Sequence, residues 1–535
     1  MKNIEIPYVK DRGKRYRFFE ILPGMITWSI LLLPLVLSQI DPKFTVVLII
    51  AYLLLWFVKS IGLNVRAIQG YRKMKLHMRL PWPQMLEELE VRKTHQPDSH
   101  IPTWHYDNIR RLQGKPPMIE PSELIHAVII ATWNESREVL EPTIQSVLNS
   151  HYDMSKVIFV LAYEARGGPE VEARAKQLVS EYKEKFKYAM STKHIDQPGE
   201  LIGKGGNITY AGRELAKYLE KENIDPARVV VTTLDSDNRP HKNYLAALSY
   251  VFCAAPDPLH VSFQPIAMYT NNIWDAPAPM RVIATGNSFW NVVLSMRPHL
   301  IRNFSAHAQS MKALIDTDFW SVRTIVEDGH QFWRSYLRYD GNYEVYPLYV
   351  PVYQDAVLLD TYRKTFKAQF VQLRRWAWGA SDIAFIAEKG YFTPNKVPKL
   401  DLTFKFLRLL EGHVSWATAP FILAFASFIP AFLNPRDYAS NQLPLMASRI
   451  QTIALLGMSI TLFFSLKTLP PKPARYKKHR SLFMVVQWVM LPVTTILYNA
   501  TAALYSQTRL MFGKYLDKFD LTQKAVITED KQKVM

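Results

Sequence analysis

The chain has 535 residues, with 65 Lys or Arg against 47 Asp or Glu, so its formal net charge is +18. Hydrophobic residues make up 48% and charged residues 21%, which excludes a disordered or collagen-like chain. A single cysteine, Cys253, excludes an internal disulfide and a thiolate metal cage. The basic balance suits either a nucleic-acid binder or a membrane protein, and the distribution of apolar residues decides between these classes.

Five hydrophobic stretches without a charge bracket a long polar middle. They cover residues 21–40, 44–58, 414–435, 450–466 and 481–508. A helix needs roughly 20 apolar residues to cross a bilayer, and the first two stretches do not have the form of a single, shorter, cleavable signal peptide. We therefore predict an integral, multi-pass membrane protein.

Basic residues flank the first two stretches on one side only. They are frequent before residue 21 and between residues 66 and 79, whereas the loop between the stretches holds only Asp41 and Lys43. The positive-inside rule then places the N-terminus and the polar middle in the cytoplasm, most simply at a bacterial plasma membrane. Topology and attraction to anionic membrane lipids explain the net charge, and we expect no nucleic-acid partner.

The polar middle alternates between apolar runs and helical stretches. We expect strands at 126–132, 157–162 and 228–234, and helices at 136–149, at 169–186 and from 242 onward. Fully apolar strands separated by helices indicate a parallel sheet covered on both faces. Ligands bind at the carboxyl ends of such strands, so the residues after each strand are the candidate site.

Polar side chains follow each of these three strands. Asn134 and Glu135 follow the first, Glu164 follows the second, and Asp235 and Asp237 end the third. The two aspartates alternate at a strand end, where they can share a hard cation that bridges phosphate oxygens. An isolated Asp-x-Asp is more often a solvated turn, but the order and spacing of the whole set favour a functional site.

Two further motifs fit the binding of a nucleotide diphosphate and a sugar. The glycine-rich loop 203–207 carries one cation, Lys204, and opens a helix, as a diphosphate cradle does. Gln372, Arg375 and Trp376 lie on one expected helix, where an indole face and a guanidinium suit a sugar ring and a phosphate. An amphipathic helix on a membrane surface would use the same residue types.

Taken together, the motifs give the chain a resemblance to a known family. It resembles the membrane-embedded family 2 glycosyltransferases, which include cellulose synthase and hyaluronan synthase, over about residues 20–525. The matching motifs come in the family's order: Asn134-Glu135, Gly203-Lys204-Gly-Gly-Asn207, Asp235-x-Asp237, Glu327-Asp328, Gln372-x-x-Arg375-Trp376 (QxxRW) and, similar to the gating loop of cellulose synthases, Phe519-Asp-Leu-Thr522-Gln-Lys524.

The resemblance implies a fold and a division of the chain. The fold would be an α/β nucleotide-diphosphosugar transferase domain of A type, with a Rossmann-like parallel sheet, flanked by transmembrane helices. The expected parts are an N-terminal segment with two spans (1–65), an interfacial linker with Trp82 and Trp104 near lipid headgroups (66–120), the cytoplasmic transferase domain (121–405), a C-terminal membrane region (406–510) and a cytoplasmic tail with the gating-like segment (511–535).

The resemblance also implies a role for each site residue. Asp328 would be the general base of an inverting transfer, and Asp237, together with Asp235, would hold Mg²⁺ or Mn²⁺. Other residues would contact the donor (Asn134, Glu135, Glu164, Lys204), the acceptor (Glu327, Gln372, Arg375, Trp376) or a gate (Phe519, Thr522, Lys524). Glu164 stands where the family has a uracil-binding Asp, and Val326 replaces the Thr of its Thr-Glu-Asp motif.

Three functions compete at this point. The leading one is a processive synthase that moves a hexose or N-acetylhexosamine from a UDP-sugar to a growing polysaccharide and exports it, alone, with an accessory export protein or as a homo-oligomer. The second is a transferase that adds one sugar to a lipid or lipid-linked acceptor, favoured by the small number of spans. A transporter or inactive scaffold is disfavoured because the spans hold almost no ionisable residue.

The last hydrophobic stretch leaves the topology open. Five full crossings would place the segment 519–524 outside the cell, where it could not gate a cytoplasmic site. The 28 residues of 481–508 are too few for two crossings of about 20 residues each. We expect Pro492 to mark a re-entrant or interfacial segment instead.

Overall fold

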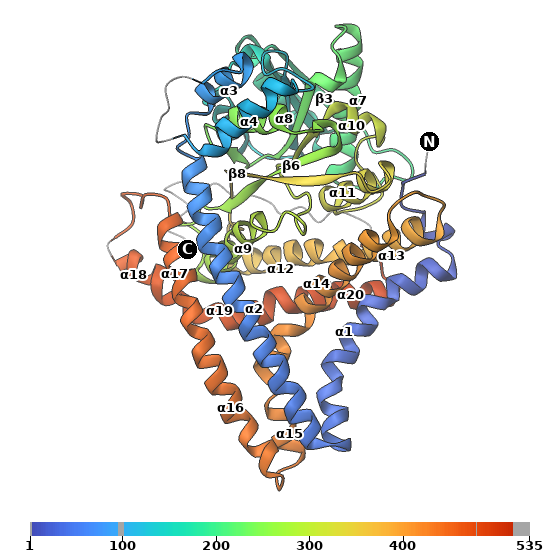
Figure 1. Cartoon of the computed structure of the whole chain (residues 1–535), viewed down its shortest axis with the longest axis vertical. Coiled ribbons are helices and arrows are strands. Elements are labelled where there is room, and N and C mark those ends of the chain that lie inside the picture. The colour runs from blue at the N-terminus through green and yellow to red at the C-terminus, as the bar shows by residue number, and fades with distance from the viewer. Residues whose placement is uncertain (1–2, 95–100, 478, 517–535) are drawn as a thin grey trace.

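The computed structural model describes residues 3–94, 101–477 and 479–516. Two parts follow one another along its longest axis: an α/β domain, and below it a set of long helices that converge toward a narrow end (Figure 1). Between them lies a belt of helices that run across this axis, among them α12 (Tyr362–Ala377) and α20 (Thr501–Met511).

Eight strands form one sheet in the order β3-β2-β1-β4-β7-β6-β8-β5. Their bounds are β1 Ile125–Thr132, β2 Val157–Glu164, β3 Tyr188–His194, β4 Val229–Asp235, β5 Arg239–Pro240, β6 Val261–Tyr269, β7 Ala308–Ser310 and β8 Glu344–Gln354. The strands β3, β2, β1 and β4 are parallel, as predicted for β1, β2 and β4. The sheet as a whole is mixed, because β7 runs antiparallel to β4 and β6, and β5 runs antiparallel to β8.

The other helices of the α/β domain and the belt have these bounds: α3 Trp82–Val91, α4 Thr103–Gly114, α5 Arg137–Leu148, α6 Pro169–Tyr182, α7 Lys204–Lys221, α8 Tyr244–Ala254, α9 Ala278–Ser295, α10 Met311–Asp316, α11 Glu327–Arg338, α13 Asp382–Ala387, α18 His479–Val486 and α19 Leu491–Thr494. The predicted helices at 136–149, 169–186 and from 242 correspond to α5, α6 and α8.

Alternate side chains of the central strands enter two separate cores. Val128 and Ile130 of β1 pack with α5 and α8 on one face, whereas Ala127 and Ile129 pack with α7 and α10 on the other. All four side chains are essentially inaccessible to solvent. Burial on both faces is why these strands read as continuous apolar runs in the sequence.

The segment between the second long helix and β1, predicted as an interfacial linker, packs onto the α/β domain. It forms α3 and α4, which pack against α8 and lie at the upper end of α2 (Figure 1). Trp82 is fully buried, and its ring and that of Trp104 lie 5.5 and 5.7 Å from the ring of Tyr250. The expectation that Trp82 and Trp104 face lipid headgroups is therefore wrong, because both belong to the domain core.

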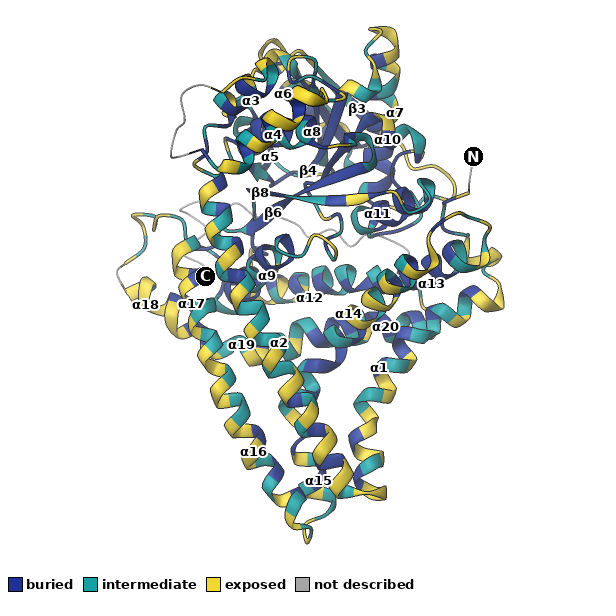
Figure 2. Ribbon diagram, in the orientation of Figure 1, coloured by how far each residue is buried: buried dark blue, intermediate teal, exposed yellow. Residues whose placement is uncertain are grey.

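The lower part consists of α1 (Lys14–Ile40), α2 (Pro42–His77), α14 (Lys399–Phe425), α15 (Phe428–Leu433), α16 (Tyr438–Ala454) and α17 (Met458–Thr468). Among the described residues, four helical stretches are long and apolar enough to cross a membrane: Lys14–Ile40, Pro42–His77, Tyr438–Thr468 and His479–Met511. Apolar side chains on the outer faces of the converging helices are exposed (Figure 2); Val58 is 64% and Val36 53% exposed.

The predicted span 414–435 is not one of these four stretches, yet it reaches the narrow end. It continues from α14 into α15, where Asn434 donates to the carbonyl of Ser38, near the end of α1, at 2.8 Å. In the lower bundle Ile422 packs with Ile49 of α2 and Leu443 of α16. Here α14 and α15 together cover the distance that α1 covers alone.

The last hydrophobic stretch, by contrast, lies across the belt. Near its start Gln487 accepts a hydrogen bond from Arg281 of α9, and near its end Ser506 donates to the carbonyl of Arg374 in α12 at 2.7 Å. Figure 1 shows α19 and α20 at the level of α12, well above the narrow end. Both ends of the stretch thus lie beside the α/β domain. The interfacial segment stays a prediction, because the stretch is also long and apolar enough to cross a membrane.

Candidate active site

The carboxyl ends of the parallel strands gather the predicted polar residues at one edge of the sheet. In the strand register Ala131 is paired with Asp235, Thr132 with Tyr163, and Glu164 with His194. The last residues of β1, β2, β3 and β4 therefore lie next to one another. The sheet forms this row because its four parallel strands end at similar heights.

Lys204 is the electrostatic centre of this edge. Its Nζ lies 2.9 Å from Asp235 Oδ1, 3.3 Å from Asp328 Oδ1 and 3.9 Å from Glu327 Oε1. Burial of the ammonium opposes its charge, but the three carboxylates outweigh it and raise the pKa of Lys204 above its usual value. Residues from three distant segments of the sequence thus form one charged cluster.

The glycines after Lys204 let helix α7 approach its neighbours closely. A Cβ on Gly205 would lie 2.5 Å from the carbonyl oxygen of Ser321, and one on Gly206 would lie 2.8 Å from the ring of His194. Asn207, one residue further on, donates to the carbonyls of Thr132 and Ala162 at 3.3 and 3.0 Å. The motif therefore fixes the start of α7 against the ends of β1 and β2 and so positions Lys204.

The two aspartates of the Asp-x-Asp motif have different surroundings. Asp235 accepts from Ser305 Oγ at 2.7 Å as well as contacting Lys204, and its side chain is 35% exposed. Asp237 is only 5% exposed, and its Oδ2 accepts from the backbone N–H of Asp355 at 3.0 Å. The second aspartate is thereby tied to the segment that follows β8.

Asp328 has a neutral imidazole as its second neighbour. His307 is buried; its Nδ1 lies 2.9 Å from the carbonyl of Phe304 and 3.7 Å from Asp328 Oδ1, and its Nε2 accepts from Trp320 Nε1 at 3.2 Å. These partners place the proton on Nδ1. Burial lowers the pKa of His307, and its Nδ1–H donates to the carbonyl of Phe304, so the ring lies beside the Asp328 carboxylate, at 3.7 Å, without a hydrogen bond to it.

Glu327 is a buried acid beside another acid. Its side chain is 2% exposed at the start of α11, and burial together with the charge of Asp328 raises the pKa of Glu327 well above its usual range. Lys204 acts in the opposite direction. Because the N-terminus of a helix favours negative charge, α11 is a suitable support for this pair of acids.

Helix α12 brings the Gln-x-x-Arg-Trp residues toward the same edge. The ring of Trp376 lies 6.0 Å from that of Tyr269, the last residue of β6. Burial and the charges of Asp235 and Asp237 raise the pKa of Tyr269, and Arg375 counteracts them. Gln372, the first residue of the motif, accepts from Gln369 at 3.1 Å. Tyr269 thus lies between the acidic cluster and α12.

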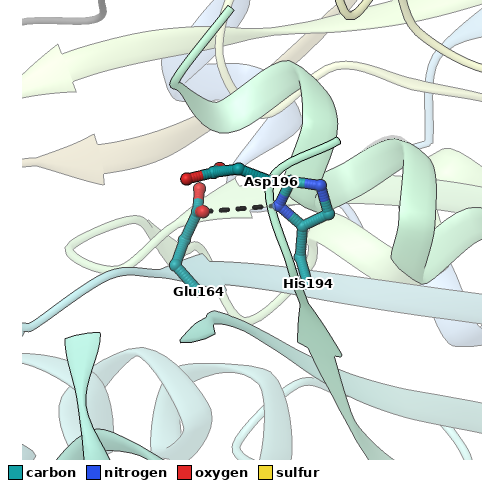
Figure 3. Close-up of side chains that lie close together, drawn as sticks. All are labelled: Glu164, His194 and Asp196. Carbon is teal, nitrogen blue, oxygen red and sulfur yellow. Dashed lines mark hydrogen bonds and ion pairs between the residues drawn. The ribbon is translucent and has the colours of Figure 1, made fainter. Parts of the chain in front are cut away.

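Glu164 and His194 form a second polar group at the ends of β2 and β3. In Figure 3 the Glu164 carboxylate faces the His194 ring, with Asp196 beside them; one ligand atom from each lies within 4.8 Å of the others. His194 Nδ1 is 3.3 Å from Glu164 and Nε2 is 3.0 Å from Glu200. Burial alone would lower the pKa of His194, but the two carboxylates raise it, so an imidazolium satisfies this group without a metal.

The residues after β1 are arranged as a self-contained turn. The Glu135 carboxylate accepts from Thr132 Oγ1 and from the backbone N–H of Trp133, both at 2.8 Å. Asn134, between them, is exposed. The geometry therefore gives Glu135 a part in shaping this turn, and its contact with a donor stays a prediction, as does that of Asn134.

The acidic cluster has the chemistry of a site for a hard divalent cation. Carboxylate oxygens of Asp235, Asp328 and Glu327 surround the Lys204 ammonium, and Asp237 follows Asp235 on the same strand end. Mg²⁺ and Mn²⁺ prefer such oxygen ligands. This donor set fits the predicted metal better than the His194 group, where both imidazole nitrogens already face carboxylates.

Several residues of the site were not predicted. Tyr269 ends a strand that was not expected, and Ser305, His307 and Asp355 lie in connecting segments without a motif. A buried histidine between two aromatic residues, Phe304 and Trp320, gives no signal in a single sequence. The gating-like residues Phe519, Thr522 and Lys524 lie outside the described residues.

Comparisons with known proteins give only distant structural likeness. No protein-family model matches the chain, and no curated protein matches it in sequence. The mannosyltransferase PcManGT from Pyrobaculum calidifontis, in complex with GDP-Man and Mn²⁺, is 13% identical with a TM-score of 0.40 and covers 85% of this chain and 100% of its own. S. aureus TarS 1–349 in complex with UDP-GlcNAc is 13% identical with a TM-score of 0.34 and covers 73% of this chain and 93% of its own. Scores this low assign no family, so the function is argued from the site.

Proposed function

We propose that the chain is a membrane-embedded, inverting glycosyltransferase that moves a hexose or N-acetylhexosamine from a UDP-sugar to a growing polysaccharide. The observation that carries this proposal is the convergence of Asp235, Glu327 and Asp328 on Lys204, at the carboxyl ends of parallel strands. Such a cluster provides a base and a cation-binding acidic group within one site, which sugar transfer from a nucleotide diphosphate requires.

Each residue has a defined part in this proposal. Asp328 takes the proton of the acceptor hydroxyl as that oxygen attacks the anomeric carbon, and the bond from that carbon to the diphosphate breaks on the opposite side. Asp235 and Asp237 hold the divalent cation, which when bound stabilises the charge of the departing diphosphate. The buried ring of His307 packs beside the Asp328 carboxylate, with Nδ1 3.7 Å from Oδ1. Gln372, Arg375 and Trp376 hold the acceptor and the diphosphate.

The donor base belongs to the second polar group. Glu164 and His194 end adjacent strands beside the turn at Asn134, at the position where the resemblance places the uracil. Because Glu164 is engaged by His194 and by Arg166, both at 3.3 Å, its carboxylate orientation is fixed before the donor binds. Lys204, which pairs with Asp235, is the cation that binds the diphosphate.

The orientation in the membrane follows from charge and packing together. The α/β domain, with the basic N-terminus, lies in the cytoplasm of a bacterial cell, and α1, α2, α14–α15 and α16–α17 cross the plasma membrane. The segment 479–511 lies at the interface, so Leu516, the last described residue, is on the domain side. Leu516 and Tyr515 line a cavity with Leu201 and Thr324, which precede Lys204 and Glu327 in the sequence by three residues each. That the segment with Phe519, Thr522 and Lys524, which lies outside the described residues, gates the donor site stays a prediction.

A second function is a transferase that adds one sugar to a lipid or lipid-linked acceptor. It is favoured by the small number of crossings in this assignment. The core between the crossing helices, which includes Ile49, Ile422 and Leu443, is filled by apolar side chains. In the polysaccharide reading, export then needs an accessory protein or a second copy of the chain.

Nucleotide release tests the proposed reaction. The purified full chain in detergent is assayed with Mg²⁺ or Mn²⁺ against a panel of UDP-sugars and GDP-sugars, and the products are sized. Asp328→Asn should lower kcat by about 10²–10⁴-fold, whereas Asp318→Asn should not change it. Asp318 is a matched control because it is exposed and has a φ of 52°, which Asn tolerates as well as Asp.

The outcomes separate the two functions. Long products from a UDP-sugar support the polysaccharide synthase, and lipid products with one added sugar support the second function. Turnover with GDP-sugars alone would contradict the assignment of Glu164 to uracil. Turnover that survives in Asp328→Asn would remove Asp328 as the base.

A further inference from the structure

A cavity of about 420 Å³ lies outside the acidic cluster, where α2 and the end of α17 meet the edge of the sheet. Its walls come from the last two turns of α2, from residues at the ends of β5, β6 and β8, and from the loop after α17. The cavity is thus at the level where membrane-crossing helices join the α/β domain (Figure 1).

Three cations line this cavity and no carboxylate does. Lys75 comes from α2, Arg239 from β5 and Lys467 from α17. Within the part of the chain that the structure describes, no carboxylate forms an ion pair with any of the three, and the buried Nε of Arg239 has no hydrogen-bond partner. A buried guanidinium N–H without a partner is costly unless a ligand satisfies it. The cavity is therefore built for an anion.

Apart from Thr270, Asn271 and Thr468, the rest of the lining is largely apolar and continues onto the membrane-facing surface. Met74, Met268 and Tyr71 form part of the wall. The ring of Tyr71 lies 5.9 Å from that of Phe464, so α2 and α17 are neighbours here, and the adjacent Phe463 is 51% exposed. An anion with a long apolar portion can place its charge among the cations and its chains along these two helices.

We propose that this cavity binds the phosphate group of an anionic membrane lipid. Lys75 and Lys467 stand near the ends of crossing helices, at the depth of lipid headgroups, where each cation strengthens the binding of an anionic headgroup. The free N–H of Arg239 adds a directional hydrogen bond to a phosphate oxygen. A soluble phosphate would use the same cations but would leave the apolar wall without a partner.

The cavity shares a wall with the predicted donor site. Asn271 lines the cavity, and its Nδ2 donates to the carbonyl of Asp237 at 3.0 Å. A lipid phosphate in the cavity is thereby one residue away from the aspartate predicted to hold the metal. The lipid site itself does not depend on the proposed transferase activity, because only binding is claimed.

Lipid titration of the full chain in detergent tests the site without any sugar donor. Affinities are measured by microscale thermophoresis for dioctanoyl phosphatidic acid, for dioctanoyl phosphatidylcholine and for inorganic phosphate. Phosphatidic acid should bind about tenfold more tightly than either comparator. Equal affinity of phosphatidylcholine would overturn the anion site, and equal affinity of inorganic phosphate would assign it to a soluble ion.

Charge-removing variants locate the binding. Lys75→Gln/Arg239→Gln should weaken phosphatidic acid about 25-fold, and Lys467→Gln, an exposed position that tolerates change, about fivefold. Arg72→Gln is the control, because Arg72 is an exposed cation on the same helix outside the cavity. If all variants bind as Arg72→Gln does, the proposal is wrong.

Discussion

The ammonium of Lys204 lies 2.9 Å from the carboxylate of Asp235, so the helix that follows the glycine-rich loop and the strand that ends in Asp-x-Asp meet in one ion pair. The side chain of Lys204 is 8% exposed, and Asp328 and Glu327 complete its surroundings. Without a neighbouring cation these three acids would repel one another in a region of low dielectric. Lys204 therefore stabilises this cluster of acids.

Replacing Lys204 should destabilise the α/β domain. Lys204→Met leaves the buried Glu327 and the partly buried Asp235 and Asp328 without a counter-charge. This costs about 2–3 kcal/mol, less than for a fully buried pair, and lowers Tm by about 5–10 °C. The loss should shrink as the pH falls toward 5, because burial and the charge of Asp328 raise the pKa of Glu327, and its protonation relieves part of the repulsion. Thermal unfolding followed by tryptophan fluorescence measures both effects.

An exposed lysine on the same helix provides the comparison. Lys217 is 71% exposed and pairs with Glu214 at 2.7 Å. Exposed pairs contribute little to stability, so Lys217→Met should change Tm by no more than about 2 °C. Equal shifts for both variants would show that Lys204 has no special place in the charge balance.

The glycine motif should be intolerant of even one methyl group. In Gly205→Ala the new Cβ would lie 2.5 Å from the Ser321 carbonyl oxygen, so α7 must move away from the segment that leads to Glu327. We expect Tm to fall by about 3–6 °C, the range for overpacking of about 1–2 kcal/mol. Gly286→Ala in α9, where the Cβ meets nothing within 4 Å, should leave Tm unchanged or raise it slightly.

The sequence predicted the part of the fold that depends on burial from both sides. β1, β2 and β4 are central strands whose side chains alternate between two cores, so their apolar runs were visible. The edge strand β3 is half-exposed, and β7 has three residues, so neither gives a comparable run. The antiparallel pairing of β7 with β4 depends on contacts made only after folding.

The candidate site was predictable where the chemistry lies in short motifs. Lys204, Asp235 and Asp328 come together although they are far apart in the sequence, because strand ends and helix starts share one edge of the sheet. His307 and Tyr269 escaped notice because their functional signal is burial beside the acids, which spacing does not reveal. The error on Trp82 has a similar cause: aromatic residues among charges fit a lipid interface and a domain core equally well.

The His194 group should make stability depend on pH in a defined direction. Burial opposes its charge, but Glu164 and Glu200 raise the pKa of His194 in the folded protein above the ordinary value of about 6.5. A histidine whose pKa is raised by folding stabilises the protein fully at pH values below its pKa in the unfolded chain. This stabilisation is lost as the pH rises through its pKa in the folded protein. Two other groups lie near the His194 ring: Arg166, which pairs with Glu164, and the ring of Tyr210. Neither reverses the direction of this pH dependence.

The comparison is between the wild type and His194→Gln at pH 5.5 and pH 8.5. We compare the Tm of the wild type minus the Tm of the variant at each pH. This Tm difference should be about 2–4 °C larger at pH 5.5 than at pH 8.5, which corresponds to about 1 kcal/mol from charge-assisted hydrogen bonds. His260→Gln, at a partly exposed histidine that pairs with Asp257, serves as the control. A gap that widens as the pH rises would mean that His194 is held neutral.

Cysteine labelling can test whether the segment 479–511 crosses the membrane. The background for this test is simple, because Cys253 is the single cysteine, and burial in α8 raises the pKa of its thiol and keeps it unreactive. In Cys253→Ala, single cysteines at exposed positions report their side: Lys115→Cys on the α/β domain, Lys43→Cys at the narrow end and Lys514→Cys after α20.

With an impermeant maleimide added to intact cells, Lys43→Cys should react, whereas Lys115→Cys and Lys514→Cys should react only after permeabilisation. The reason is that Ser506 and Gln507 bind the carbonyls of Arg374 and His413, which holds the end of the segment on the domain side. Labelling of Lys514→Cys together with Lys43→Cys in intact cells would mean that the segment is a full crossing. The tail could then no longer act as a gate for the site at Lys204.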